Sequence, residues 1–328
     1  MIATPSFAEV LEARDTIAPY LRPTGLYHYQ ALSDLAGAEL WLKHENHQPT
    51  GAFKVRGGIN FVAHLSDEAR RRRILTASSG NHGLSVAYAA ELFGVRAVVV
   101  VPNGANPGKV EAIKGYGAKI RFVGKDFDDC RAYVERTAES EGMHYLSSGD
   151  EPLLVTGVAT YTLEILEAQP GIDVVIVPVG GGSGAAGACL VAKAMNPGIE
   201  VIGVQSERAP AAYRSWKEGR RVEAAMETFA EGLATRAPFD LTQAILRRDL
   251  NDFVLVSDEE LRSAMRLLLE KTRNLVEGAG AAALAAALKH RDRLLGKRVA
   301  LIVSGGNVSL EGLRELLSDD GSAPPQEQ

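Results

Sequence analysis

Lys54 is the residue whose neighbours in the sequence most favour chemistry. It lies in Thr50-Gly-Ala-Phe-Lys-Val-Arg-Gly-Gly58, beside an aromatic residue and between glycines. A lysine acts as a nucleophile or base near neutral pH only when burial or nearby cations lower its pKa. Phe53 and Val55 could form an apolar wall, Arg56 could be the neighbouring cation, and the glycines could let the chain turn tightly beside a bound ring. Most lysines are solvated, so this stretch alone does not establish a site.

A second stretch, Val177-Pro-Val-Gly-Gly-Gly-Ser-Gly-Ala-Ala-Gly187, is a glycine-rich loop between a predicted strand and a predicted helix. Backbone N–H groups of such a loop can surround a phosphate, and the helix N-terminus favours the anion. The same letters contain GxGxxG, the dinucleotide-binding pattern, which predicts an acidic residue at the end of the next strand. That strand ends in Gln205, with Glu207 two residues later. The glycines could also have a purely structural role, which is to let the helix pack tightly on the strand.

Two further loops carry polar side chains after predicted strands. Thr76-Ala-Ser-Ser-Gly-Asn-His-Gly83 leads into a helix, and its serine, asparagine and backbone donors suit a carboxylate, although an ordinary N-cap uses the same residue types. Ser304-Gly-Gly-Asn307 could direct the Ser304 hydroxyl at a buried ring nitrogen, although alone it is an ordinary turn.

These four features together describe one ligand. A phosphate site, a carboxylate site, a hydroxyl for a ring nitrogen and a lysine of low pKa match a pyridoxal phosphate Schiff base that carries an amino acid. An NAD(P)-dependent dehydrogenase would use one loop and leave the other features unexplained, so it is a remote alternative. A non-catalytic binding module is a further alternative, which the presence of Lys54, Ser79 and Ser304 disfavours.

The elements that must position these loops alternate between short β-branched runs and helical patterns. Strands are predicted at residues 74–77, 97–101, 119–123, 174–178, 201–204, 253–256 and 298–303, and helices at residues 81–93, 107–116, 127–140, 152–167, 185–196 and 261–271. This alternation predicts an α/β architecture with mostly parallel sheets. We expect a large domain of residues 1–52 and 146–317, a small domain of residues 53–145, and a disordered tail at 318–328.

Composition limits the partners and the compartment. The 328 residues carry a formal net charge of −5, which argues against a nucleic-acid or anionic-membrane partner. Only two cysteines are present, and no signal peptide or membrane span is visible, so we expect a cytoplasmic protein. The run Arg70 to Arg73 follows a helix-like stretch from Leu65, and because cations late in a helix complement its dipole, we interpret these arginines as the end of a helix and not as a nucleic-acid patch.

In order and spacing the sequence resembles the threonine/serine dehydratase and serine racemase group of pyridoxal-phosphate enzymes, which have the tryptophan-synthase β-type fold (fold type II). The resemblance covers residues 22–307 and is carried by Thr50-Gly-Ala-Phe-Lys-Val-Arg-Gly57, Ser78-Ser-Gly-Asn-His-Gly83, Val179-Gly-Gly-Gly-Ser-Gly184, Glu277-Gly-Ala-Gly280 and Ser304-Gly-Gly-Asn307. It implies two open, twisted, mostly parallel α/β domains with the cofactor in the cleft between them. It also implies loss of water from L-threonine, L-serine or a related β-hydroxy amino acid, giving a 2-keto acid and ammonia.

The resemblance also implies roles for individual residues. Lys54 would hold the cofactor and remove the α-proton, and the other cofactor contacts would be Phe53, Asn81, Gly180, Gly181, Gly182, Ser183, Gly184, Gly232, Glu277 and Ser304. Asn81 would bond the ring hydroxyl and Ser304 would face the pyridine nitrogen. The substrate carboxylate would be held by Ser78, Ser79, Gly80, Asn81 and His82.

Ser79 keeps a second activity open. In the racemases a serine at this position protonates the opposite face of the carbanion, so a serine or related racemase is the closest alternative. The members are usually dimers or tetramers, so we expect a homo-oligomer that takes a small amino-acid substrate.

Departures from the family pattern concern the substrate and a metal. Ala52 replaces a serine, Ser183 ends the glycine run, and residues 157–160 and 147–152 are atypical, which hints at a roomier pocket. The racemase-type cation site would fall on Gln205 and Ala211, so we expect no metal there unless the site is rebuilt from Glu207.

Overall fold

The structure is a computed structural model that describes residues 3–78 and 80–318. Its larger sheet has six strands in the order β1-β2-β10-β7-β8-β9. These are β1 (Leu26–His28), β2 (Glu39–His44), β7 (Val174–Pro178), β8 (Glu200–Ser206), β9 (Asp252–Val256) and β10 (Arg298–Val303). Only β1 is antiparallel to its neighbour. The inner strand β7 is buried on both faces, which explains its uninterrupted apolar run.

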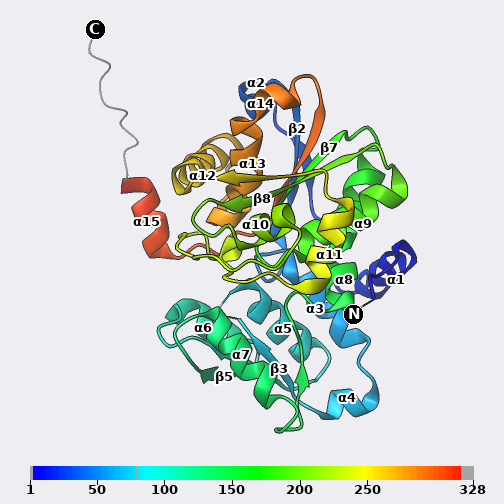
Figure 1. The fold of residues 1–328 in the computed structure, drawn as a ribbon, viewed down its shortest axis with the longest axis vertical. Helices are drawn as coiled ribbons and strands as arrows, with labels where there is room; N and C mark the ends of the chain where they lie inside the picture. The colour runs from blue at the N-terminus through cyan, green and yellow to red at the C-terminus, as the bar shows by residue number, and fades with distance from the viewer. Residues whose placement is uncertain (1–2, 79, 319–328) are drawn as a thin grey trace.

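The smaller sheet is parallel throughout and has the order β5-β4-β3-β6. Its strands are β3 (Ile74–Ala77), β4 (Ala97–Val101), β5 (Lys119–Phe122) and β6 (His144–Tyr145). The helices around it are α3 (Lys54–Ala63), α4 (Asp67–Arg71), α5 (Asn81–Leu92), α6 (Pro107–Gly115) and α7 (Phe127–Thr137). Figure 1 shows this group in the lower half of the view, below the larger sheet.

The remaining helices surround the larger sheet. They are α1 (Phe7–Ile17), α2 (Gln30–Ala36), η1 (Glu45–His47), α8 (Pro152–Ala168), α9 (Ser183–Met195), α10 (Ala211–Glu218), η2 (Glu231–Leu233), α11 (Asp240–Asp249), α12 (Asp258–Thr272), α13 (Gly278–Lys289), α14 (Arg291–Leu294) and α15 (Leu310–Ser318). One core cluster joins α8, α9 and one sheet face, and another joins α12, α13 and the opposite face.

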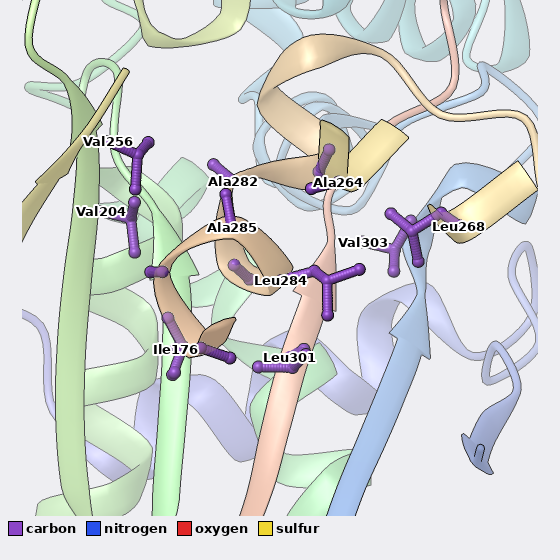
Figure 2. Packing of buried hydrophobic residues seen from close by; sticks show 14 of the residues in the cluster. Ile176, Val204, Val256, Ala264, Leu268, Ala282, Leu284, Ala285, Leu301 and Val303 are labelled. Carbon is purple, nitrogen blue, oxygen red and sulfur yellow. The ribbon is translucent and has the colours of Figure 1, made fainter. Parts of the chain in front are cut away.

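Helix α13 is buried on all sides. Residues 278–287 are all buried, and the alanines let the helix lie close to the sheet. Figure 2 shows Ala282, Leu284 and Ala285 against Ile176, Leu301 and their neighbours. The helix has no polar face, so it lacks the periodicity by which a surface helix is predicted, and we did not predict it.

Two of the glycines after Lys54 do not form a turn, which corrects the expectation for that stretch. Gly57 and Gly58 lie inside α3, where neighbouring chains come very close. A Cβ on Gly57 would lie 2.9 Å from the Leu154 carbonyl oxygen of α8, and one on Gly58 would lie 2.3 Å from Ser85 Oγ of α5. The turn before Lys54 depends instead on Gly51, whose φ of +69° favours glycine.

The predicted α/β class is confirmed, and the predicted strands and helices lie within a few residues of the observed ones. The helix expected before the arginine run is α4. Besides α13, elements that we did not predict include β1, β2, β6, α1, α2 and α3. The domain bounds stay a prediction. Of the tail predicted to be disordered at residues 318–328, Ser318 instead ends helix α15, and residues 319–328 lie outside the described residues. Within the described part of the chain, no helix combines the length and hydropathy that a membrane span requires.

Candidate active site

A cavity of about 350 Å³ lies where loops from the two sheets meet. Pro178, Ser304 and Ser78 lie at or just after the carboxyl ends of β7, β10 and β3, and all three line it. Ligands of open α/β sheets bind outside this edge of the strands. The predicted site residues that line the cavity are Phe53, Lys54, Ser78, Gly80, Asn81, His82, Gly180, Gly182, Ser183, Gly184, Gly232, Glu277 and Ser304. Gly181 lies in the same loop without lining the cavity, and Ser79 falls outside the described residues.

Lys54 is the first residue of α3, and its ammonium points into this cavity. Nζ lies 2.8 Å from Oγ of Ser183 and 5.2 Å from the centre of the Phe53 ring. Burial lowers the pKa of Lys54 to about 8, because a charged amine loses its hydration there. The neutral amine is therefore accessible just above neutral pH, where an ordinary lysine is almost fully charged.

Arg56 is not the cause of this low pKa, contrary to the expectation from the sequence. Its guanidinium donates to Glu45 Oε2 at 2.7 Å and to Glu164 Oε1 at 2.6 Å. Lys43 joins the same group by donating to Glu164 at 2.5 Å. Arg56 and Glu45 are 1% and 0% exposed, so this is a buried network behind α3. It ties α3 to η1 and α8 and thereby holds the backbone that carries Lys54.

The glycine loop forms an anion-binding arrangement at the N-terminus of α9. The first N–H groups of α9 have no acceptor inside the helix, so they can bind a ligand. Gly182 has φ +90°, and a Cβ on Gly180 would lie 2.2 Å from the Gly232 carbonyl oxygen. Thr242 donates its hydroxyl to the Gly181 carbonyl at 2.8 Å. This bond holds the Gly181 carbonyl against α11.

The N-terminus of α5 faces the same cavity. Asn81 begins the helix, and Ser78 Oγ accepts the Gly80 N–H at 3.1 Å, which holds the turn before it. His82 is buried, and its pKa is lowered to about 3, mainly by burial and also by the charge of Lys54. Thr76 donates its hydroxyl to the Leu146 carbonyl, so it accepts from Nε2–H of His82. The imidazole is therefore neutral, with its proton on Nε2.

Ser304 and Glu277 also line the cavity. Ser304 follows β10 and is 5% exposed, and its hydroxyl makes no hydrogen bond within the described part of the chain. Glu277 accepts from Nδ2 of Asn81 at 2.6 Å. Burial raises the pKa of Glu277, and the Asn81 bond opposes this rise. A neutral hydroxyl and an acidic side chain therefore face the same space.

Gln205 and Glu207, which were considered for a metal site and for dinucleotide binding, both have structural partners. Gln205 donates to the Leu233 carbonyl and accepts the Tyr213 N–H, both inside the core. Glu207 pairs with Lys289 at 3.0 Å. Among residues 3–78 and 80–318, no three His, Cys, Asp or Glu side chains are grouped so that they could hold a metal ion.

Two of the four departures from the family pattern line the cavity, and two do not. Ser148 and Ser183 are part of its wall. Ala52 instead forms a bridge with Gly305, and residues 157–160 lie in α8, where Gly157 and Thr160 contact α3. The atypical 157–160 stretch is thus part of the contact between α3 and α8.

This donor set fits pyridoxal phosphate. A buried amine of lowered pKa, free N–H groups at a helix N-terminus and an unpaired serine hydroxyl, all within the described residues, surround one cavity. They match the aldehyde, the phosphate and the ring nitrogen of that cofactor. Fold and site together therefore define a pyridoxal-phosphate enzyme of fold type II.

Comparison with known proteins agrees. The model of the family described as "Pyridoxal-phosphate dependent enzyme" matches residues 17–305. An L-threonine ammonia-lyase of Thermotoga maritima is 38% identical over 312 residues, which cover 94% of this chain and 77% of that protein. The chain belongs to the pyridoxal-phosphate-dependent enzyme family.

Two solved structures share the fold over nearly the whole chain. A threonine deaminase from the organism abbreviated T.th. has a TM-score of 0.86 and 38% identity, covering 93% of this chain and 99% of that one. Maize serine racemase has a TM-score of 0.89 and 32% identity, covering 96% and 99%. The relatives identify this chain as a lyase-type enzyme that uses pyridoxal phosphate, and they include both activities weighed above.

Proposed function

We propose that this protein is an amino-acid ammonia-lyase acting on L-threonine, L-serine or a related β-hydroxy amino acid. The observation that carries the proposal is the meeting of three groups in one cavity: Lys54, the N-terminus of α9 and the N-terminus of α5. Relatives named as threonine ammonia-lyase and threonine deaminase support it. Elimination removes water and hydrolysis of the amino product returns it, so the net products are a 2-keto acid and ammonia.

The cofactor would be held by groups already described. The amine of Lys54 would hold it covalently, the N–H groups from Gly180 to Gly184 would bind its phosphate, and Ser304 would accept or donate at the ring nitrogen. Gly232 and Phe53 would lie beside it. When bound, pyridoxal phosphate supplies the electron sink that makes the α-proton of an amino acid acidic.

The chain itself positions the substrate and moves the proton. The donors of residues 78–82, at the N-terminus of α5, would hold the α-carboxylate. Neutral Lys54 would take the α-proton, and its pKa of about 8 leaves enough neutral amine to do so. His82 is neutral and bonded to Thr76, so it would hold the turn instead of exchanging protons.

A neutral group at the ring nitrogen favours elimination. The Ser304 hydroxyl does not force protonation of that nitrogen, whereas an aspartate would. The electron sink is then weaker, and prompt loss of a β-leaving group is favoured over reactions that need a long-lived carbanion.

The test is a substrate panel with the purified holoprotein. L-Serine, L-threonine and larger β-hydroxy amino acids are assayed in parallel for 2-keto acid, ammonia and D-amino acid. We expect keto acid and ammonia in equal amounts from at least one of them. No keto acid from any member would overturn the proposal. A visible absorption band that borohydride abolishes, and that Lys54→Ala lacks, would exclude the dehydrogenase.

Racemisation is the second candidate, and the likeness to maize serine racemase supports it. Ser79 is the residue that would protonate the opposite face, on the resemblance alone. Ser79→Ala should then spare elimination from the L-substrate and abolish any D-product, and D-product in excess of keto acid from L-serine would make racemisation the main activity. We also propose a cytoplasmic homo-oligomer, dimer or tetramer, which sedimentation analysis and cell fractionation would test.

A further inference from the structure

The side chain of Asn307 joins three loops that the sequence presents separately. Its Nδ2 donates to the Thr50 carbonyl at 2.8 Å, in the loop before Lys54. The same Nδ2 donates to Oδ1 of Asn81 at 2.8 Å, at the N-terminus of α5. Asn307 itself belongs to the loop after β10 that also carries Ser304. One amide therefore links the loop before Lys54, the N-terminus of α5 and the loop that carries Ser304.

The direction of these hydrogen bonds follows from the Thr50 carbonyl. A backbone carbonyl can only accept, so the atom of Asn307 that faces it must be the NH2 group. The Asn81 atom that faces the same NH2 group must then be its oxygen. The NH2 group of Asn81 is left to face Glu277, and it donates to that carboxylate at 2.6 Å. The chain of bonds is therefore consistent in one orientation of both amides.

The local backbone is shaped to admit the Asn307 amide. A Cβ on Gly51 would lie 2.4 Å from Oδ1 of Asn307, so any side chain there would displace the Asn307 amide. The Gly306 N–H donates to the Gly51 carbonyl at 2.9 Å, and Ala52 bridges Gly305. These contacts hold the two loops together beneath the cavity wall.

We propose that Asn307 is a positioning residue that, together with Glu277, fixes the orientation of the Asn81 amide. With its oxygen bound to Asn307, Asn81 can only donate to a ligand in the cavity, because one hydrogen of its NH2 group goes to Glu277 and the second stays available. Asn81 then offers an N–H to the ring oxygen of pyridoxal phosphate. The inference rests on the proposed function only in that this cofactor must bind.

Two variants of nearly equal shape separate positioning from packing. Asn307→Asp places an acceptor where the donor was, so the Asn81 oxygen would face a carboxylate and the orientation that Glu277 favours is opposed. The Asn81 amide should then turn its NH2 group toward residue 307 and its oxygen toward the ligand. Asn307→Leu removes the donor, but Glu277 still accepts from the Asn81 NH2 group and keeps the original orientation. Both variants lose the bond to Thr50. A purely structural role would make Asn307→Leu at least as harmful as Asn307→Asp.

The measurement is a titration of the cofactor-free variants with pyridoxal phosphate, followed by visible absorption, with unfolding temperatures recorded in parallel. We expect Asn307→Asp to bind the cofactor at least about tenfold more weakly, the effect of one lost hydrogen bond to a charged group, and to shift the absorption band. Asn307→Leu should stay within about threefold of the unaltered protein. Equal affinities, or a larger loss for Asn307→Leu, would overturn the inference.

A third variant covers the case in which Asn307→Asp does not fold. Asn81→Asp keeps an acceptor for Asn307 and loses the whole donating edge, including the bond to Glu277, so it should reproduce the weaker cofactor binding and the shifted band. Unaltered cofactor binding by Asn81→Asp would contradict the proposal. Failure of the unaltered protein to bind pyridoxal phosphate at all would instead contradict the proposed function.

Discussion

The ammonium of Lys54 lies 2.8 Å from Oγ of Ser183, although 129 residues separate them in the sequence. Lys54 begins α3 and Ser183 begins α9, so two helix N-termini meet at this contact. The amine that would hold the cofactor and the loop that would bind its phosphate are thereby brought together by the fold. Neither stretch establishes a site alone, and their contact is what makes the assignment specific.

The first prediction concerns the pH dependence of Lys54. Because burial lowers its pKa to about 8, the neutral amine should predominate above that pH. The rate at which the cofactor-free protein becomes covalently attached to pyridoxal phosphate should therefore rise with pH and level off above about 8, the pKa of the group. Stopped-flow absorption on both sides of this pH measures it. A midpoint near the ordinary lysine value of 10.5 would show that the amine is solvated.

Removal of the amine provides the companion measurement. Lys54→Ala should lower the rate of keto acid formation by about 10²–10⁴-fold, the usual contribution of a general base, and should leave no cofactor attached after borohydride treatment. Because His82 is neutral at these pH values, His82→Gln should not move the midpoint of the attachment rate. A midpoint displaced by His82→Gln would show that this imidazole does titrate.

The loops that line the cavity could be predicted from the sequence, whereas the buried network that supports them could not. Glycines and serines that follow apolar runs indicate ligand-binding loops, because residues close in the sequence determine both the end of a strand and the start of the next helix. The Arg56 network was not predictable, because Glu164 lies 108 residues from Arg56 and only the fold brings them together. For the same reason, the expected contribution of Arg56 to the low pKa of Lys54 was wrong, whereas the expected burial of the amine does lower that pKa.

The second prediction tests this buried network. Arg56→Met leaves Glu45, which is fully buried, without its guanidinium partner. Breaking a buried ion pair costs about 3–5 kcal/mol, so urea unfolding of the cofactor-free variant should show a loss of this size. The exposed pair of Arg72 and Glu68 is the control, and Arg72→Ala should change the unfolding free energy by less than about 1 kcal/mol. Equal losses for both variants would mean that the network does not stabilise α3.

The third prediction concerns the shape of the phosphate loop. In Gly180→Ala the new Cβ would meet the Gly232 carbonyl oxygen at 2.2 Å, and backbone cannot move aside as a flexible side chain can. Pyridoxal phosphate should then bind at least about tenfold more weakly, as expected when one charge-assisted hydrogen bond is lost. Gly115→Ala is the matched control, since nothing in the described part of the chain lies within 4 Å of its Cβ position and its backbone is compatible with alanine. Cofactor titration of both variants decides, and unchanged affinity for Gly180→Ala would contradict the assignment of the loop.

The fourth prediction is that Glu277 lowers the stability of the fold at alkaline pH but strengthens cofactor binding. Burial raises the pKa of this carboxyl, so between the unfolded value of 4.5 and the folded value the native protein binds more protons than the unfolded chain. Its contribution to stability is therefore fully present below 4.5 and is lost as the pH rises through the folded pKa. Glu277→Gln removes this loss, so the cofactor-free variant should be more stable than the unaltered protein at mildly alkaline pH, and the difference should shrink in mild acid.

The same variant should bind the cofactor more weakly, because a glutamine is a poorer acceptor for the Asn81 NH2 group that the carboxylate now holds at 2.6 Å. Urea unfolding at the two pH values, with cofactor titration beside it, measures both effects. If the variant is less stable than the unaltered protein at mildly alkaline pH, the Glu277 carboxylate stabilises the fold. Its presence in the cavity wall is then explained by stability alone, and the prediction fails.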